Sequence, residues 1–193
     1  SLIQNHTSAV YTGIHLLSVF MSNARYHFTT RWTLDAGCEE IYHILEKATD
    51  LPRWWPSVYL EVLELEQGAP DGVGKYIALH TKGWLPYTLR WNFRVTAAHF
   101  PTGYTLEADG DFEGRGVWTF RPLPDGRCEA VYDWQISARK PLLKYLTFLL
   151  RPLFSANHRW AMRQGEESLR KELLRRRHHA APRRDSASEL VTA

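Results

Sequence analysis

A run of short strand-like segments followed by one long helical pattern constrains the fold of this chain most strongly. From Arg25 onward, apolar and polar residues alternate with a period of two, which is typical of strands. Six further strand-like runs follow a short helical segment, at residues 58–66, 74–81, 87–97, 103–108, 112–121 and 127–137. The turns between these six runs are too short for helical crossovers. The pattern therefore predicts an antiparallel meander.

Helical segments flank this meander on both sides. Asp35 is expected to cap a short helix that runs through Leu45, with acidic residues in its first turn. The segment Asp50-Leu51-Pro52-Arg53-Trp54-Trp55-Pro56 is too rich in proline for a long helix and predicts one turn or a bend. Residues 142–177 show the apolar period of one long helix, with an interruption at most near Pro152.

These elements predict an α+β fold in which a strongly curved antiparallel sheet wraps around the long C-terminal helix, because each covers the apolar face of the other. We expect one domain at residues 25–177. Residues 178–193 lack apolar periodicity and predict a disordered basic tail. Residues 1–24 form an uncharged extension, and Met21 reads like a translation start, so residues 1–20 are expected to be an upstream or appended segment.

The net charge of +3 is concentrated at the C-terminal end of the chain. Residues 175–193 carry five arginines against Asp185 and Glu189, and the rest of the chain is balanced. A balanced body argues against binding to nucleic acid, which needs basic residues spread over a face. The basic tail would allow weak contact with an anionic membrane. No stretch reaches the roughly 20 apolar residues of a spanning helix.

Cysteine and histidine patterns give no sign of a metal site. The two cysteines, Cys38 and Cys128, are too few for a stapled secreted domain, and we interpret them as reduced thiols in a cytoplasmic protein. Neither cysteine has the spacing of a metal-ligand set, and no nucleotide- or phosphate-binding motif occurs. We therefore expect no metal and no cofactor.

Aromatic residues are unusually frequent, with 8 Trp, 9 Tyr and 8 Phe. So many large rings need either a thick core or a cavity lined with them. Several share one face of a predicted strand, and the strand glycines Gly114 and Gly116 favour a sheet curved over a hollow. The residues that we expect to bind a ligand lie on these strand faces and on the apolar face of the long helix: Tyr87, Trp91, Trp118, Tyr132, Trp134, Phe154, His158 and Met162.

Three of the polar residues are candidates for acid–base chemistry. His158 lies on the apolar face of the long helix, either as a cavity-facing donor or as a hydrogen-bonded core histidine. Tyr132 is the second candidate. Asp109 belongs to a group of acids around Gly110, which is either an acid–base pair or a set of solvated loop carboxylates.

The chain resembles the START-like helix-grip superfamily, in particular the polyketide cyclase/dehydrase-type SRPBCC proteins. The resemblance covers residues 25 to 177. It rests on four segments: the Asp50–Pro56 segment, Gly72-Val73-Gly74, Gly116-Val117-Trp118-Thr119-Phe120, and Asn157-His158-Arg159-Trp160-Ala161-Met162 with Gly165-Glu166-Glu167-Ser168-Leu169. It implies a deep cavity between sheet and helix for an apolar polyketide-, lipid- or quinone-like ligand.

Two functions of different classes stay open on this basis, because one fold hosts many activities, and a third interpretation is a membrane-associated lipid or quinone carrier that uses the basic tail on anionic lipid. The first is binding of an apolar small molecule in the cavity. The alternative is a polyketide cyclase/dehydratase of the aromatase type, which needs a positioned acid and base and donors for a developing enolate. The sequence does not identify the ligand or the oligomeric state.

Overall fold

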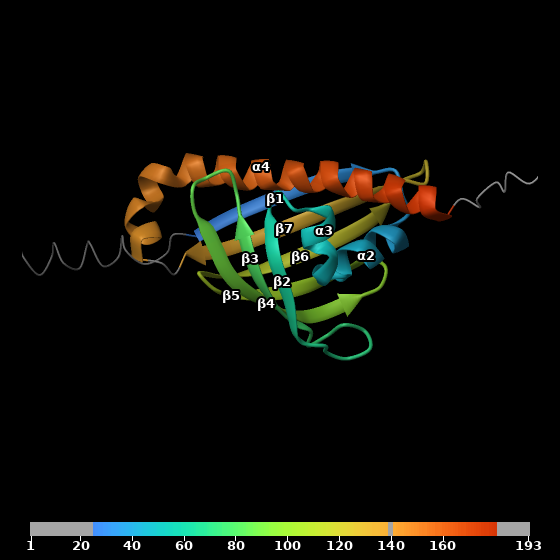
Figure 1. Ribbon diagram of the computed structural model, residues 1–193, viewed down its shortest axis with the longest axis horizontal. Helices are drawn as coiled ribbons and strands as arrows, with labels where there is room; N and C mark the ends of the chain where they lie inside the picture. The colour runs from blue at the N-terminus through green and yellow to red at the C-terminus, as the bar shows by residue number, and fades with distance from the viewer. Residues whose placement is uncertain (1–24, 139–140, 181–193) are drawn as a thin grey trace, which may run out of the picture.

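The computed structural model describes residues 25–138 and 141–180, with the backbone alone for residues 138 and 141–150. They form one seven-stranded antiparallel sheet with helices on its concave side (Figure 1). The strands are β1 (Arg25–Leu34), β2 (Tyr59–Glu66), β3 (Tyr76–Lys82), β4 (Thr88–His99), β5 (Gly103–Gly110), β6 (Phe112–Pro122) and β7 (Cys128–Ala138). The helices are α2 (Cys38–Glu46), η1 (Ala48–Asp50), α3 (Leu51–Trp54) and α4 (Pro141–Ala180).

The sheet order is β1-β7-β6-β5-β4-β3-β2, so each strand from β2 to β7 pairs with its neighbour in sequence. β1 pairs with β7 and so forms one edge of the sheet. Its register runs from Arg25 opposite Ser137 to Leu34 opposite Cys128. The segment from α2 to α3 connects the two edge strands, β1 and β2, and α4 runs across the sheet (Figure 1). The predicted fold class, a curved antiparallel sheet around a long C-terminal helix, is confirmed.

The ends of two helices differ from the prediction. α2 begins at Cys38 and its N-cap is Gly37, with no side-chain cap, so the prediction that Asp35 caps this helix is wrong. The Asp35 carboxylate instead lies 3.9 Å from Arg170 of α4. α4 continues to Ala180, so residues 178–180 are helical and do not belong to a disordered tail. Residues 1–24 and 181–193 lie outside the described residues.

α4 also continues through Pro152, the residue at which we expected an interruption. The helix bends in its N-terminal part (Figure 1), the part that contains this proline. A proline inside a helix removes one backbone hydrogen bond and bends the axis without necessarily ending it. No helix among the described residues is both long enough and apolar enough to cross a membrane.

The concave face of the sheet is densely filled toward one end. Trp32 of β1, Phe120 of β6 and Leu169 of α4 are each no more than 2 % exposed. α2 adds Tyr42, whose ring meets that of Phe120 edge-on at 5.9 Å. At this end β1, β6, β7, α2 and the C-terminal half of α4 therefore form a continuous core.

A buried ion-pair cluster joins α3 to α4 at the same end. The Glu172 side chain is 1 % exposed and accepts paired hydrogen bonds from Arg53 of α3 and from Arg175, at 2.8–2.9 Å. Arg176 donates a further bond of 2.8 Å. The bonds from Arg175 and Arg53 hold the pKa of the Glu172 carboxyl well below its usual range.

The two cysteines meet where α2 approaches the start of β7. Both are free thiols, and their Sγ atoms lie 3.1 Å apart, although 90 residues separate them in sequence. Cys128 is fully buried and Cys38 half-buried. Burial, and then the hydrogen bond from Cys38, raises the pKa of the Cys128 thiol to about 12.

Candidate functional site: an aromatic cavity

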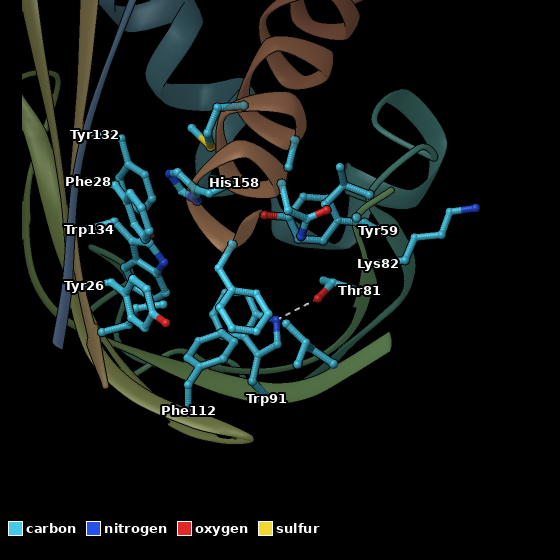
Figure 2. A pocket seen from close by; sticks show the side chains of 18 of the residues that line it. Tyr26, Phe28, Tyr59, Thr81, Lys82, Trp91, Phe112, Tyr132, Trp134 and His158 are labelled. Carbon is cyan, nitrogen blue, oxygen red and sulfur yellow. Dashed lines mark hydrogen bonds between the residues drawn. The ribbon is translucent and has the colours of Figure 1, made fainter. Parts of the chain in front are cut away.

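Toward the other end of the sheet the concave face is hollow. A cavity of about 190 Å³ lies between the sheet and residues 154–162 of α4 (Figure 2). That volume exceeds the roughly 150 Å³ of an engineered apolar cavity that takes up benzene. Half of the described residues that line it are Phe, Tyr or Trp, namely Tyr26, Phe28, Trp55, Tyr59, Tyr87, Trp91, Phe112, Tyr132, Trp134 and Phe154.

The position of each strand residue along its strand decides whether it lines the cavity or fills the core. In β1, Tyr26 and Phe28 face the cavity whereas Trp32 is packed in the core. In β6, Phe112 lines the cavity and Phe120 belongs to the packed end. The alternation along each strand determines which side chains point to the concave face. The helices packed over that face determine where it is filled and where it stays hollow.

Trp55 forms the floor between the packed core and the cavity. Its indole lines the cavity and meets Trp32 of the core edge-on, with ring centroids 5.9 Å apart. On the other side it lies against Gly165 of α4, where any Cβ would overlap the indole ring. Glycine at 165 therefore lets the helix descend onto Trp55 and close this end of the cavity.

His158 projects from α4 into the cavity. Its imidazole stacks on Phe28, and its Nε2 atom is buried without a hydrogen-bond partner among the described residues. Burial, and then the nearby Arg159 charge, lowers the pKa of His158 to about 4. The imidazole is therefore neutral at neutral pH and suits hydrogen bonding better than proton transfer.

Four tyrosines line the cavity, namely Tyr26, Tyr59, Tyr87 and Tyr132. The Tyr26 side chain is buried, and its hydroxyl oxygen has no partner within the described part of the chain. Burial raises the pKa of Tyr132 well above its ordinary value, so its phenol stays protonated. The Tyr132 hydroxyl occupies the space beside Gly116, where a Cβ would stand 2.5 Å from it.

Asn157 fastens the loop between β3 and β4 against α4. Its Oδ1 atom accepts hydrogen bonds from the backbone N–H groups of Trp84 at 2.9 Å and Leu85 at 3.3 Å. The Asn157 amide lies where a side chain at Gly83 would stand, so glycine is needed at this close approach. Gly83 and Asn157 both line the cavity, and this contact therefore holds the loop at its wall.

Seven of the eight predicted ligand-binding residues line the cavity: Tyr87, Trp91, Tyr132, Trp134, Phe154, His158 and Met162. Their contact with a ligand stays a prediction. Trp118 does not line it, and its placement there was wrong. Its ring packs among core rings, 5.2 Å from Trp32 and 5.9 Å from Phe120.

Asp109, predicted as a catalytic candidate, lies away from the cavity. It accepts hydrogen bonds from the Tyr76 hydroxyl at 3.0 Å and from the Asn92 amide at 2.8 Å. β5 continues through Gly110, so Asp109 keeps its strand position and points to the face opposite buried Ala108. The described cavity lining contains no carboxylate.

Sequence reasoning missed several residues of the cavity wall. Tyr26 and Phe28 alternate with polar residues in β1, and Trp55 follows the proline-rich turn. The signal for Tyr26 and Phe28 was available, because they share a strand face with buried Trp32. No pattern in the sequence indicated that Trp55 would face the cavity.

Several solved structures share this architecture. Neither a protein-family model nor a curated protein matches the sequence. The Zhui aromatase/cyclase from Streptomyces sp. R1128 matches with a TM-score of 0.67 and 16 % identity, over 81 % of this chain and 98 % of that one. A START superfamily protein from Mycobacterium smegmatis matches with a TM-score of 0.57 and 13 % identity, over 77 % and 97 % of the two chains.

A third match shows how varied the proteins of this shape are. Norcoclaurine synthase from Thalictrum flavum has a TM-score of 0.55 and 14 % identity, over 81 % of this chain and 98 % of that one. At such identities the likeness concerns the backbone and not the residues of a site. Together with the curved sheet and its long helix, these matches show that the chain has the START-like helix-grip fold.

Proposed function

We propose that this protein binds an apolar small molecule, of polyketide-, lipid- or quinone-like character, in the cavity between its sheet and α4. The observation that supports this most directly is the lining itself, half of it aromatic and with a single charged side chain, Lys82, among the described residues. Lys82 is exposed. An apolar hollow of this kind favours ligands that lose little hydration on entry.

A polyketide cyclase/dehydratase is the second candidate. The similarity in fold to an aromatase/cyclase and the buried His158 and Tyr132 support it. The acid–base properties of the cavity favour binding instead. His158, with a pKa of about 4, is a weak base, and Tyr132 holds its proton at neutral pH.

Titration with the uncharged dye N-phenyl-1-naphthylamine tests the binding function. We expect one dye per protein and quenching of tryptophan emission, because Trp91 and Trp134 line the cavity. Ala161→Phe should reduce dye affinity at least tenfold by filling the cavity from α4. The matched control is Glu167→Phe, which adds the same ring to an exposed position of the same helix. Equal affinity in both variants contradicts binding in this cavity.

Native mass spectrometry of protein purified without detergent would identify a ligand that co-purifies. Incubation with cyclisable polyketone analogues separates the two candidates. Binding without turnover supports a binding protein. Turnover that disappears in both His158→Phe and Tyr132→Phe, with the fold intact, supports the enzyme.

The basic C-terminal end of the chain, Arg175–Arg177 with Arg183 and Arg184, carries a separate proposal. We propose weak contact of this tail with anionic membranes and no binding to nucleic acid, in a cytoplasmic protein. Co-sedimentation with vesicles containing 30 mol % phosphatidylserine tests the contact. Replacing Arg177, Arg183 and Arg184 with glutamine should abolish sedimentation without unfolding the protein.

A further inference from the structure

Three buried polar atoms on cavity-lining side chains have no hydrogen-bond partner among the described residues: His158 Nε2, the Tyr26 hydroxyl oxygen and Trp55 Nε1. Tyr26 is only 6 % exposed and Trp55 only 3 %. Buried polar atoms in folded proteins are nearly always paired, so each exception needs an explanation. A ligand that carries its own hydrogen-bonding group would provide the missing partner.

The side chains that carry the first two atoms, His158 and Tyr26, both stack on the ring of Phe28. Tyr26 stacks on Phe28 with centroids 5.8 Å apart and 17° between the planes. Phe28 in turn stacks on the His158 imidazole at 4.1 Å and 20°. In Figure 2 the His158 ring, which projects from α4, lies beside Phe28, and Tyr26 lies with Phe28 on the sheet side of the cavity.

Flat rings also form the wall contributed by β7. Tyr132 and Trp134 are stacked with centroids 5.5 Å apart and 21° between the planes. Aromatic faces make their best contacts with other flat rings, in offset-stacked or edge-on arrangements. Walls of this shape favour a planar ligand over a flexible chain.

The scarcity of charged side chains in the lining restricts the class of ligand further. Lys82 is the one charged side chain among the described lining residues, and in Figure 2 its ammonium group points away from the cavity. A carboxylate or phosphate inside would lose its hydration without gaining a counter-ion. His158 does not supply one, since burial keeps its imidazole neutral.

We propose that the cavity selects an uncharged, planar aromatic molecule with a hydroxyl group, which hydrogen-bonds to His158 Nε2 or to the Tyr26 hydroxyl. This inference rests on the proposed binding function and adds the charge, shape and polar contact of the ligand. A hydroxyl fits because it both donates and accepts, and so pairs with either tautomer of the imidazole. His158 and Tyr26 are then the residues that determine specificity.

Isothermal titration calorimetry with three probes of one shape tests the proposal: naphthalene, 2-naphthol and 2-naphthoate. For the wild-type protein at pH 7 we expect 2-naphthol to bind about five- to tenfold more tightly than naphthalene, the gain typical of one hydrogen bond. 2-Naphthoate should bind at least tenfold more weakly than 2-naphthol, because its charge is desolvated.

Two variants assign the contact, and a third serves as control. His158→Phe and Tyr26→Phe keep an aromatic ring, and at least one should bring the affinity ratio of 2-naphthol to naphthalene within twofold of one. Tyr76→Phe removes a tyrosine hydroxyl on the outer face, where it bonds Asp109, and should leave the ratio unchanged. If His158→Phe or Tyr26→Phe does not fold, His158→Leu or Tyr26→Leu takes its place, so that both contacts are tested.

The outcomes separate this inference from the function on which it rests. If naphthalene binds but the hydroxyl adds no affinity, or if 2-naphthoate binds as tightly as 2-naphthol, the inference alone is wrong. A preference for 2-naphthol that persists in both cavity variants also overturns it. If none of the three probes binds, the proposed binding function and the inference fail together.

Discussion

The imidazole of His158 stacks on the ring of Phe28, with ring centroids 4.1 Å apart and 20° between the planes. This contact joins α4 to the edge strand β1 at the cavity. Because the surroundings are apolar, burial lowers the pKa of His158 to about 4. The ring therefore acts as a neutral aromatic residue with a polar edge, and its protonation is linked to folding.

The first prediction concerns the pH dependence of stability. In the unfolded chain His158 takes up a proton near its ordinary pKa of 6.5, but in the folded protein it does so only near 4. Between these values the unfolded state binds more protons, so wild-type stability falls as pH is lowered. From pH 7 to pH 5 this residue should account for a loss of about 2 kcal/mol.

Urea unfolding of wild type and His158→Phe at pH 7 and pH 5 measures this linkage. The loss on acidification should be about 2 kcal/mol smaller in the variant. Glu167→Phe adds a ring at an exposed position of α4 without removing a histidine and should lose as much as wild type. An equal loss in wild type and His158→Phe would show that His158 titrates normally in the folded state.

The second prediction concerns Glu172. Replacing it with glutamine leaves Arg53, Arg175 and Arg176 without their shared carboxylate, and should cost about 2–3 kcal/mol at pH 7. The cost is below that of a fully buried pair because the arginines are partly exposed.

The pH dependence of this cost has a definite sign. The folded-state pKa of Glu172 is lowered from an ordinary 4.5, so its contribution is present above 4.5 and is lost as pH falls below that value. The difference between wild type and Glu172→Gln in urea unfolding should therefore shrink below pH 4.5. Glu167→Gln, at an exposed position of α4, should change stability by less than about 0.5 kcal/mol.

The third prediction concerns Gly165. Replacing a glycine inside a helix with alanine normally stabilises it by about 1 kcal/mol. Here the new methyl group overlaps the indole of Trp55, so Gly165→Ala should destabilise the fold by about 1–3 kcal/mol. Glu167→Ala, on the exposed side of the same helix, provides the comparison in thermal unfolding. A Gly165→Ala variant more stable than wild type would mean that Trp55 moves aside freely.

The fourth prediction concerns the loop that Asn157 holds. Asn157→Ala removes the acceptor for the Trp84 and Leu85 N–H groups and should speed both association and dissociation of the dye by about tenfold. Stopped-flow tryptophan quenching measures the rates. Asn92→Ala, on the outer face of β4, should leave them unchanged.

Gly83→Ala provides an independent route to the same change. Its methyl group displaces the Asn157 amide, so the double variant should be no faster than Asn157→Ala alone. Additive effects of the two substitutions would show that the loop is held by other contacts.

The sheet could be predicted from the sequence because its signals are local. Alternation over residues 112–121 and the turn chemistry around Gly126 predicted a strand that the structure bounds at Phe112 and Pro122. The N-terminus of α2 could not be predicted as well, since the polar residue at 35 is a good cap by type. The chain instead remains extended at Gly37, and the helix begins one residue later.

The cavity was harder to predict, because alternation gives the face of a strand but not what covers it. Trp91 and Trp118 both point to the concave face, yet only Trp91 lines the hollow. The difference arises from Trp32, whose ring fills the space beside Trp118, and such a contact between distant strands leaves no local pattern.

The thiol pair of Cys38 and Cys128 gives the protein a built-in reporter of local opening. With a pKa of about 12, only about one Cys128 thiol in ten thousand is ionised at pH 8, and it is also fully buried. An alkylating reagent therefore modifies Cys128 only when α2 separates from the start of β7. The rate at which Cys128 is labelled therefore measures how often the packed end opens, and no residue has to be introduced for the experiment.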